Sequence, residues 1–180
     1  MTITAGPVGS VPPVRQSTLV RAPLAATFET FVRTIDAWWP KLTHSVGKER
    51  ARRVVLEAHA GGRFYEEWDD GTTHTWGELT VWEPPDRFVM TWLNTPAPTE
   101  VELTFRAEGE GTRVAVEHRG WEALSVAERG EDCAAPGGYT SGSYSRGWAM
   151  ILERMAGTVA TAIGAGVGEA AETETSEARR

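Results

Sequence analysis

Residues 144–159 read YSRGWAMILERMAGTV. Large apolar residues recur in this stretch at steps of three and four, which places them on one face of an α-helix: Tyr144, Trp148, Ile151, Leu152, Met155 and Val159. Because this face is wide and aromatic, it needs an equally wide partner. The alternating segments between Arg52 and Trp121 supply one. The sequence therefore predicts an α+β fold in which a curved antiparallel sheet closes around one long helix.

The sheet is predicted from segments in which apolar and polar residues alternate strictly, as expected for one buried and one solvated face. Turn-forming Gly, Pro and Asp residues separate these segments. The expected strands are 14–22, a segment from about 51 to 57, 63–68, 73–82, 87–92, 101–106 and 113–118. A helix is expected from Leu24 to Trp38, ending before Pro40. Lys41 to Lys48 should form a short helical turn or loop.

The 180 residues most simply form one domain with a substantial core. We expect residues 1–13 to be disordered, 14–163 to form the domain, and 164–180 to be a flexible tail. The segment between Trp121 and Gly142 has no clear period and is broken at Pro136-Gly137-Gly138. Eight tryptophans are an unusual number and suit either a bulky core or an aromatic cavity.

The formal net charge of −7 argues against nucleic acid or an anionic membrane as the main partner. No segment is apolar for long enough to span a bilayer, and the N-terminus lacks the pattern of a secretory signal. A single cysteine, Cys133, fits a reducing compartment. We therefore expect a cytoplasmic protein. Its oligomeric state is open, with a homodimer among the options.

Several short motifs resemble the homologues of the activator of heat-shock-protein-90 ATPase, within the START-like (SRPBCC) superfamily. They are Ala37-Trp38-Trp39-Pro40, Gly61-Gly62-Arg63-Phe64-Tyr65-Glu66, Trp76-Gly77, Glu83-Pro84-Pro85-Asp86-Arg87, Thr91-Trp92, Gly111-Thr112-Arg113-Val114, His118-Arg119-Gly120-Trp121 and Gly147-Trp148. The resemblance covers roughly residues 14 to 160 and implies the helix-grip fold. Superfamily members include lipid and hormone carriers and polyketide aromatases and cyclases, so the fold alone does not assign a function.

A helix lying across a concave sheet can leave a ligand cavity between them. We expect its lining to come from the inward face of the sheet and the apolar face of the helix: Phe64, Glu66, Leu79, Met90, Trp92, Leu103, Phe105, Val116, Tyr144, Trp148, Leu152 and Met155. Trp38 and Trp39 are candidates for the lip of its mouth, or alternatively for a cap on the open end of the sheet. The competing interpretation of the whole set is a solid core.

Two residues are candidates for acid/base chemistry. Glu66, if it points inward rather than Tyr65, would place a carboxylate among tryptophans; the alternative is a structural hydrogen bond to an indole or to Thr75. His118 stands where the alternation requires an apolar residue, so it is either a proton shuttle and ligand contact or a hydrogen-bonded core histidine.

No motif predicts a cofactor. His44, His59 and His74 show no metal-ligand spacing with His118 or Cys133. The sequence thus favours a carrier or sensor for a small hydrophobic or aromatic molecule. The alternative is a cofactor-independent cyclase or dehydratase acting on a polyketide-like substrate, and a weaker one is a chaperone activator that uses the outer face of the sheet.

Overall fold

The computed structural model of the protein describes residues 11–131 and 143–177, with only the backbone described for 130–131, 143 and 163–177. Seven strands form one antiparallel sheet in the order β1-β7-β6-β5-β4-β3-β2. They are β1 (Val14–Val20), β2 (Ala51–Leu56), β3 (Arg63–Trp68), β4 (Thr73–Glu83), β5 (Arg87–Trp92), β6 (Thr99–Glu108) and β7 (Gly111–Arg119). The strands predicted from alternation are confirmed, with ends that differ by a few residues.

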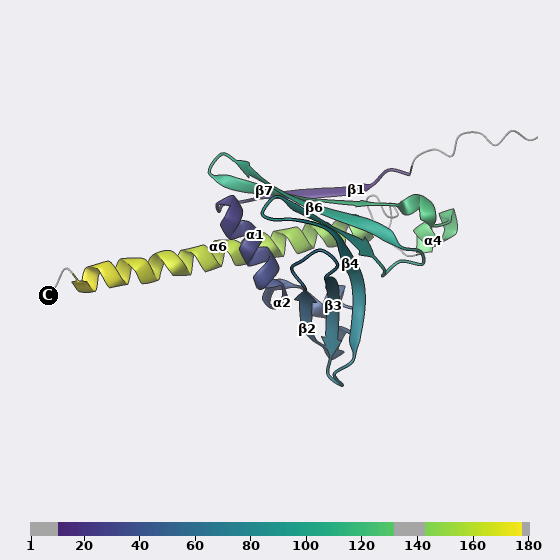
Figure 1. Ribbon diagram of the computed structural model, residues 1–180, viewed down its shortest axis with the longest axis horizontal. Coiled ribbons are helices and arrows are strands. Elements are labelled where there is room, and N and C mark those ends of the chain that lie inside the picture. Colours follow the sequence, from purple (N-terminus) through teal and green to yellow (C-terminus); the bar gives the residue numbers. More distant parts are fainter. Residues whose placement is uncertain (1–10, 132–142, 178–180) are drawn as a thin grey trace, which may run out of the picture.

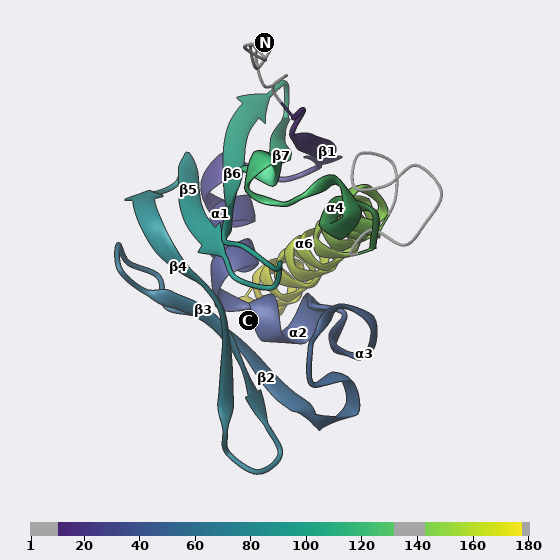
Figure 2. The same ribbon diagram turned by 90° about the vertical axis from the view of Figure 1, so that its right-hand side faces the viewer.

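The sheet curves around the helices, as Figures 1 and 2 show. The long helix α6 (Ser143–Glu177) packs along β1 and against α1 (Leu24–Arg33). Two short helices, α2 (Ile35–Trp38) and α3 (Lys41–His44), follow α1, and a 3-10 turn, η1 (Lys48–Arg50), leads into β2. After β7 come the 3-10 turn η2 (Trp121–Ala123) and α4 (Val126–Glu131). The helix-grip arrangement is therefore confirmed.

The inward parity predicted for the strands is also confirmed. Phe64 and Glu66 of β3 are buried, whereas Tyr65 and Glu67 are only partly so. Buried Met90, Leu103 and Val116 come from β5, β6 and β7, and Trp148, Leu152 and Met155 of α6 lie in the same core. The sheet and α6 thus contribute to one core, as expected from the two-residue repeat of the strands and the 3.6-residue repeat of the helix.

The helix predicted from Leu24 to Trp38 is divided in two. Thr34 separates α1 from α2, with φ −109° and ψ 16° in place of helical values. Threonine is stiff at χ1 and a weak helix former, because its hydroxyl competes for backbone groups. Here the Thr34 hydroxyl donates to the Thr30 carbonyl at 2.6 Å. The break turns α2 so that Trp38 and Trp39 reach the core.

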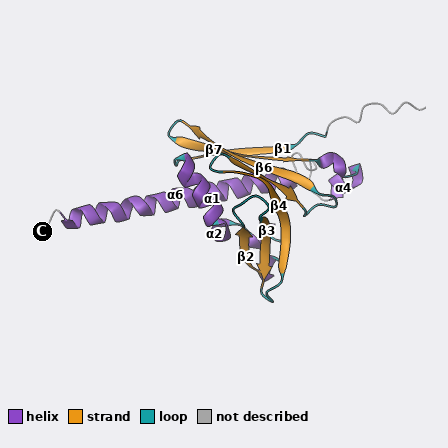
Figure 3. Cartoon of the chain, viewed as in Figure 1, coloured by secondary structure: helices purple, strands orange, loops and turns teal. Residues whose placement is uncertain are grey.

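A second difference concerns the end of α6, which runs to Glu177 and not to about Ile163. Figure 3 shows it continuing well past the sheet. Residues 164–177 contain no proline and are rich in Ala and Glu, which are good helix formers. The expected flexibility of this tail stays a prediction. Cys133 and the break at Pro136–Gly138 lie outside the described residues, as do residues 1–10 of the predicted disordered segment.

Candidate functional site

A cavity of about 260 Å³ opens where α3, the end of β5 and the first turns of α6 meet. Its walls are largely aromatic and aliphatic, with a few polar groups between them. The lining residues are Trp39, Thr43, His44, Ser45, Val46, Trp92, Asn94, Tyr144, Gly147, Trp148 and Ile151. An apolar concavity with a small number of polar groups is the usual form of a small-molecule site.

The α6 wall follows from the helical repeat, since Tyr144, Trp148 and Ile151 share one face. Gly147 lies between them in the lining and lets the chain after Pro40 come close. A Cβ at Gly147 would lie 3.3 Å from His44 Nε2, which is closer than an ordinary van der Waals contact. A glycine at this point therefore sets how near α3 approaches α6.

The opposite wall, formed by residues 43–47, is held to the sheet by Glu66. The Gly47 amide donates to Glu66 Oε1 at 2.7 Å, and Trp68 Nε1 donates to the same oxygen at 2.8 Å. The Arg50 guanidinium lies over the Trp68 ring at 4.5 Å. Because the Gly47 segment carries Ser45 and Val46, this buried carboxylate positions part of the cavity wall.

Several polar groups in the lining already have partners. Tyr144 Oη donates to the Asn94 carbonyl at 3.0 Å, and Trp39 Nε1 donates to the His44 carbonyl at 3.3 Å. His44 Nδ1 lies 2.7 Å from Thr43 Oγ1. Partial burial lowers the pKa of His44, so its imidazole is neutral near pH 7 and can either donate or accept a hydrogen bond.

The interior beyond this cavity is filled by side chains. A space of only about 10 Å³ remains among core residues that include Phe64, Met90 and Leu103. Aromatic rings occupy the region: Trp39 and Trp76 have centroids 5.0 Å apart, and Phe64 and Trp76 4.7 Å apart. Around these described residues the deep part of the predicted cavity is thus a packed core, and the 260 Å³ of open volume lies at its mouth.

Glu66 is 0% exposed and takes part in structural hydrogen bonds, although to Trp68 and Gly47 and not to Thr75. Of the two interpretations given for Glu66, the structure agrees with a structural hydrogen bond to an indole, here that of Trp68. Glu66 does not line the 260 Å³ cavity. Its second oxygen, Oε2, is buried without a partner among the described residues.

His118 is fully buried and its hydrogen bonds are satisfied. Its Nε2 lies 2.7 Å from Thr99 Oγ1, and Trp148 Nε1 donates to its Nδ1 at 3.3 Å. Because Nδ1 accepts this bond, the neutral ring carries its proton on Nε2. Burial lowers the pKa of His118 to about 3. His118 is therefore the hydrogen-bonded core histidine of the second interpretation. Neither His118 nor Glu66 lines the cavity, so the two do not converge on it.

Of the residues predicted to bind a ligand, the structure brings four together in the lining: Trp39, Trp92, Tyr144 and Trp148. The others are buried in the core behind it: Phe64, Glu66, Leu79, Met90, Leu103, Phe105, Val116, His118, Leu152 and Met155. A ligand-contacting role for either group stays a prediction. Of the two tryptophans proposed for the lip, Trp39 lines the mouth and Trp38 is a core residue.

Seven lining residues were not foreseen: Thr43, His44, Ser45, Val46, Asn94, Gly147 and Ile151. Three of them, Ser45, Val46 and Asn94, lie in connections, and Thr43 and His44 lie in the one-turn helix α3, which is too short to show a periodicity. The available signals were the polar run after Pro40 and the glycine within an otherwise aromatic helix turn. Trp76 was also missed as a core residue, because a register shift between Phe64 and Tyr65 adds one residue to β4 and changes its parity.

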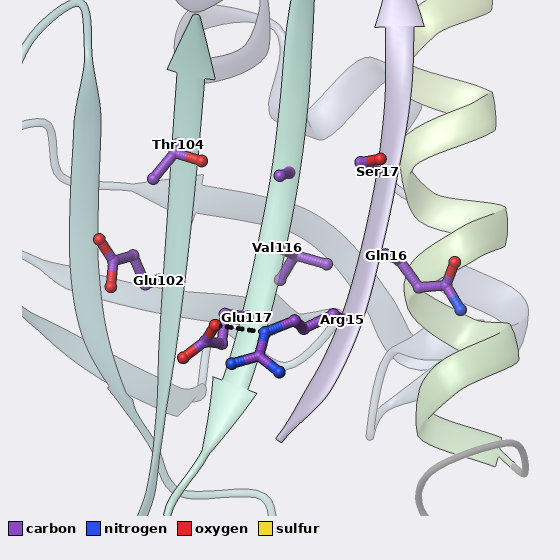
Figure 4. A pocket seen from close by; sticks show the side chains of 8 residues that line it. Arg15, Gln16, Ser17, Glu102, Thr104, Val116 and Glu117 are labelled. Atoms are coloured by element: carbon purple, nitrogen blue, oxygen red, sulfur yellow. Dashed lines mark hydrogen bonds and ion pairs between the residues drawn. The ribbon is translucent and has the colours of Figure 1, made fainter. Parts of the chain in front are cut away.

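A larger concave region of about 510 Å³ lies on the outer face of the sheet, over β1, β7 and β6. Figure 4 shows Arg15 and Glu117 facing each other there, with an ion pair of 2.7 Å, while Gln16 extends toward α6. Arg119 and Arg87 contact Glu102 on the same face at 2.6 and 3.1 Å. The hydrogen bond from Arg119, with a further one from Arg87, holds the pKa of Glu102 below its usual value.

The outer face over β1, β7 and β6 thus carries several paired charges. Among the described residues, no group of three or more His, Cys, Asp or Glu side chains could hold a metal ion. Within the same part of the chain, no helix is long and apolar enough to cross a membrane.

Comparisons with known proteins agree with the fold. Residues 21–160 match the family model described as activator of Hsp90 ATPase homolog 1-like protein. A comparison with curated protein sequences finds no match. An AHSA1-like protein from Aeromonas hydrophila is 18% identical, with a TM-score of 0.53 and coverage of 83% of this chain and 94% of that one. At this identity the likeness concerns the fold.

Two further solved structures are each 27% identical to the chain. One is the self-sacrificing resistance protein CalC from Micromonospora echinospora, with a TM-score of 0.58 and coverage of 82% of this chain and 94% of that one. The other is the anthrahydroquino-gamma-pyrone synthase Txn09 complexed with SUM, with a TM-score of 0.51 and coverage of 83% and 97%. Proteins similar in structure to this chain thus include both a resistance protein and a biosynthetic enzyme.

Proposed function

Because this chain belongs to the family of activator of Hsp90 ATPase homolog 1-like proteins, we propose that it uses the family's fold to bind a small aromatic molecule, as a carrier or sensor. The 260 Å³ cavity between α3, β5 and α6 is the proposed site. The single observation that carries the proposal is the lining itself, in which four aromatic side chains surround open volume. Such walls bind flat apolar ligands by burial and ring contacts.

The position of the cavity supports entry of a ligand from solvent. Leu42 and Val46, in and just after α3, are 66% and 51% exposed. Exposed apolar side chains at the rim of a concavity are typical of binding sites. The segment that carries them is short and is attached through Gly47 and Glu66, so a small movement of residues 42–46 would widen the entrance.

A second function, cofactor-independent catalysis of cyclisation or dehydration, is favoured by one observation. His44 and Tyr144 are both titratable and both line the cavity, so two groups suited to proton transfer face the same ligand. The 27% identity to a synthase is compatible with this alternative. The variant His44→Gln distinguishes the two functions. In a carrier it would change only the ligand affinity, whereas in an enzyme it would abolish turnover and retain ligand binding.

The test of the binding function is calorimetric titration with a panel of planar two- and three-ring aromatic compounds, after native mass spectrometry of the freshly purified protein. We expect saturable binding of one molecule per chain and a raised melting temperature. Thr43→Trp places a large ring in the lining at an exposed position and should abolish binding. The matched control is Met150→Trp, at an exposed residue of α6 outside the lining and its rim, which should bind normally.

The proposal is overturned if no compound of the panel binds or shifts the melting temperature. It is also overturned if the two variants lose affinity equally, because binding would then not depend on the cavity. Circular dichroism of both variants establishes that the comparison is made between folded proteins.

A further inference from the structure

The structure has a small set of buried polar atoms that lack partners, and they gather on one side of the core. Among the described residues, these side-chain atoms are Ser45 Oγ, Glu66 Oε2, Trp76 Nε1 and Trp92 Nε1. A buried donor or acceptor left without a partner costs roughly 1–3 kcal/mol, so folded proteins keep few of them. Four in one region therefore need an explanation.

Two of the four belong to residues in the cavity lining. Ser45 and Trp92 are only 6% and 7% exposed, and each presents an unpartnered donor group in that wall. The other tryptophans of the lining are different: Trp39 Nε1 donates to the His44 carbonyl and Trp148 Nε1 to His118. The donor of Trp92 thus has no partner among the described residues, whereas those of Trp39 and Trp148 are committed to the fold.

The remaining two atoms lie directly behind the lining. Trp76 contacts both Trp39 and Trp92, with ring centroids 5.0 and 6.3 Å apart. Glu66 is tied through Gly47 to the segment that carries Ser45. The unpartnered atoms therefore follow the inner wall of the cavity.

His44 adds a group of another kind. Thr43 Oγ1 lies 2.7 Å from His44 Nδ1 and also reaches the Pro40 carbonyl at 3.3 Å. When the hydroxyl donates to the carbonyl it accepts from Nδ1–H, which leaves His44 Nε2 as an acceptor; this tautomer is assigned from the network. Nε2 lies beside Gly147, another lining residue.

We propose that the ligand is an oxygenated planar aromatic molecule, whose carbonyl-type oxygen accepts hydrogen bonds from Trp92 Nε1 and Ser45 Oγ and whose hydroxyl group bonds His44 Nε2. This inference rests on the proposed function and names its ligand class. Trp92 Nε1 and Ser45 Oγ are covered by neighbouring atoms, so the ligand reaches them by displacing side chains at the mouth. A hydrocarbon of the same shape fills the same space and leaves these donors unpaired.

The experiment compares matched ligands by calorimetry. The first pair is 2-acetylnaphthalene and 2-isopropenylnaphthalene, which differ in a ketone oxygen replaced by a methylene group. The second pair is 2-naphthol and 2-methylnaphthalene. We expect the oxygenated member of each pair to bind about 3–10-fold more tightly, the ratio that corresponds to one net hydrogen bond of about 0.5–1.5 kcal/mol.

Variants then assign the contacts. Trp92→Phe and Ser45→Ala should each bring the ratio of ketone to hydrocarbon affinity close to one, whatever change the variant makes in the affinity for the hydrocarbon itself. His44→Leu should remove the preference for 2-naphthol. Ser17→Ala, on the outer face, is the control and should change neither ratio. Ser45→Ala deletes a single oxygen, so it keeps the test available if Trp92→Phe fails to fold.

Equal affinities within each pair, or preferences that the three lining variants do not alter, overturn the inference and leave the binding function standing. If neither member of either pair binds, the inference fails; if no compound of the wider aromatic panel binds either, the proposed function fails with it.

Discussion

Trp148 Nε1 donates a hydrogen bond to His118 Nδ1 at 3.3 Å and so joins the second turn of the long helix to β7. The two rings are nearly perpendicular, with centroids 6.2 Å apart. Trp148 also contacts Trp92 at 5.5 Å and lines the cavity. One side chain therefore belongs both to the attachment of α6 and to the proposed ligand site.

Replacing this indole should destabilise the protein strongly. Trp148→Ala removes a buried ring and leaves His118 Nδ1 without a donor, so we expect a loss of about 3–5 kcal/mol in the free energy of unfolding. Urea denaturation measures it. Met150→Ala, at an exposed position of the same helix, is the control. Apart from the difference in helix propensity between Met and Ala, it should change the free energy of unfolding by less than about 0.5 kcal/mol. A loss under about 1 kcal/mol for Trp148→Ala would show that α6 does not dock as described.

Stability should fall on mild acidification because of His118. Its pKa in the folded protein is about 3, against 6.5 for an ordinary histidine, so the unfolded state binds the proton more readily. The stabilisation is full above pH 6.5 and is lost as the pH falls from 6.5 towards 3, with a slope of up to about 1.4 kcal/mol per pH unit. Denaturant melts between pH 6.5 and 4.5 measure it.

The measured range, from pH 6.5 to 4.5, does not extend below the ordinary Glu pKa of 4.5. Protonation of carboxylates therefore contributes little to the change in stability within it. His44, whose pKa is also lowered by burial, acts in the same direction, and His44→Gln determines its share. His118→Gln should be less stable at pH 7 and should show a flatter profile. A wild-type profile that is flat across this range would contradict the description of His118 as a buried neutral ring.

Glu66 should act through the acceptor oxygen it offers rather than through its charge. In Glu66→Gln the amide oxygen can still accept from the Gly47 amide and Trp68 Nε1, so we expect a change within about 1 kcal/mol. Glu66→Leu leaves both donors unpaired and should cost about 2–4 kcal/mol, since each costs roughly 1–3 kcal/mol. Thermal and urea unfolding measure both variants. If Glu66→Gln is as damaging as Glu66→Leu, the charge itself is required.

Gly147→Ala should separate stability from ligand binding. Alanine favours a helix over glycine by about 1 kcal/mol, but its Cβ would press against His44 Nε2 at 3.3 Å. We expect little loss of melting temperature and a clear loss of ligand affinity. Gly157→Ala is the matched control, because a Cβ there meets nothing within 4 Å. It should stabilise the helix and leave affinity unchanged; equal affinities for the two variants would exclude His44 from the site.

Much of the fold could be predicted from local periodicity. The three- and four-residue spacing of Trp148, Leu152 and Met155 placed them on one helix face. The choice between Glu66 and Tyr65 as the inward residue was left open by the alternation, and the structure decides it for Glu66. The failures occurred where a single residue changed the pattern. Thr34 divided a helix, and the register shift before Tyr65 brought Trp76 into the core.

The sequence by itself determined the inward face of α6 and of most strands, because that face depends on the repeat of each helix or strand; the inward position of Trp76 depended on a register shift that no repeat shows. Only the tertiary structure decided where open volume remains. Phe64 and Leu103 lie in the packed core, whereas Trp92 and Tyr144 line the cavity. That difference depends on how α3, β5 and α6 meet across long separations in the chain. These contacts depend on the tertiary packing of short segments that have no sequence periodicity. His44 and Ser45 could therefore be identified as lining residues only from the folded structure.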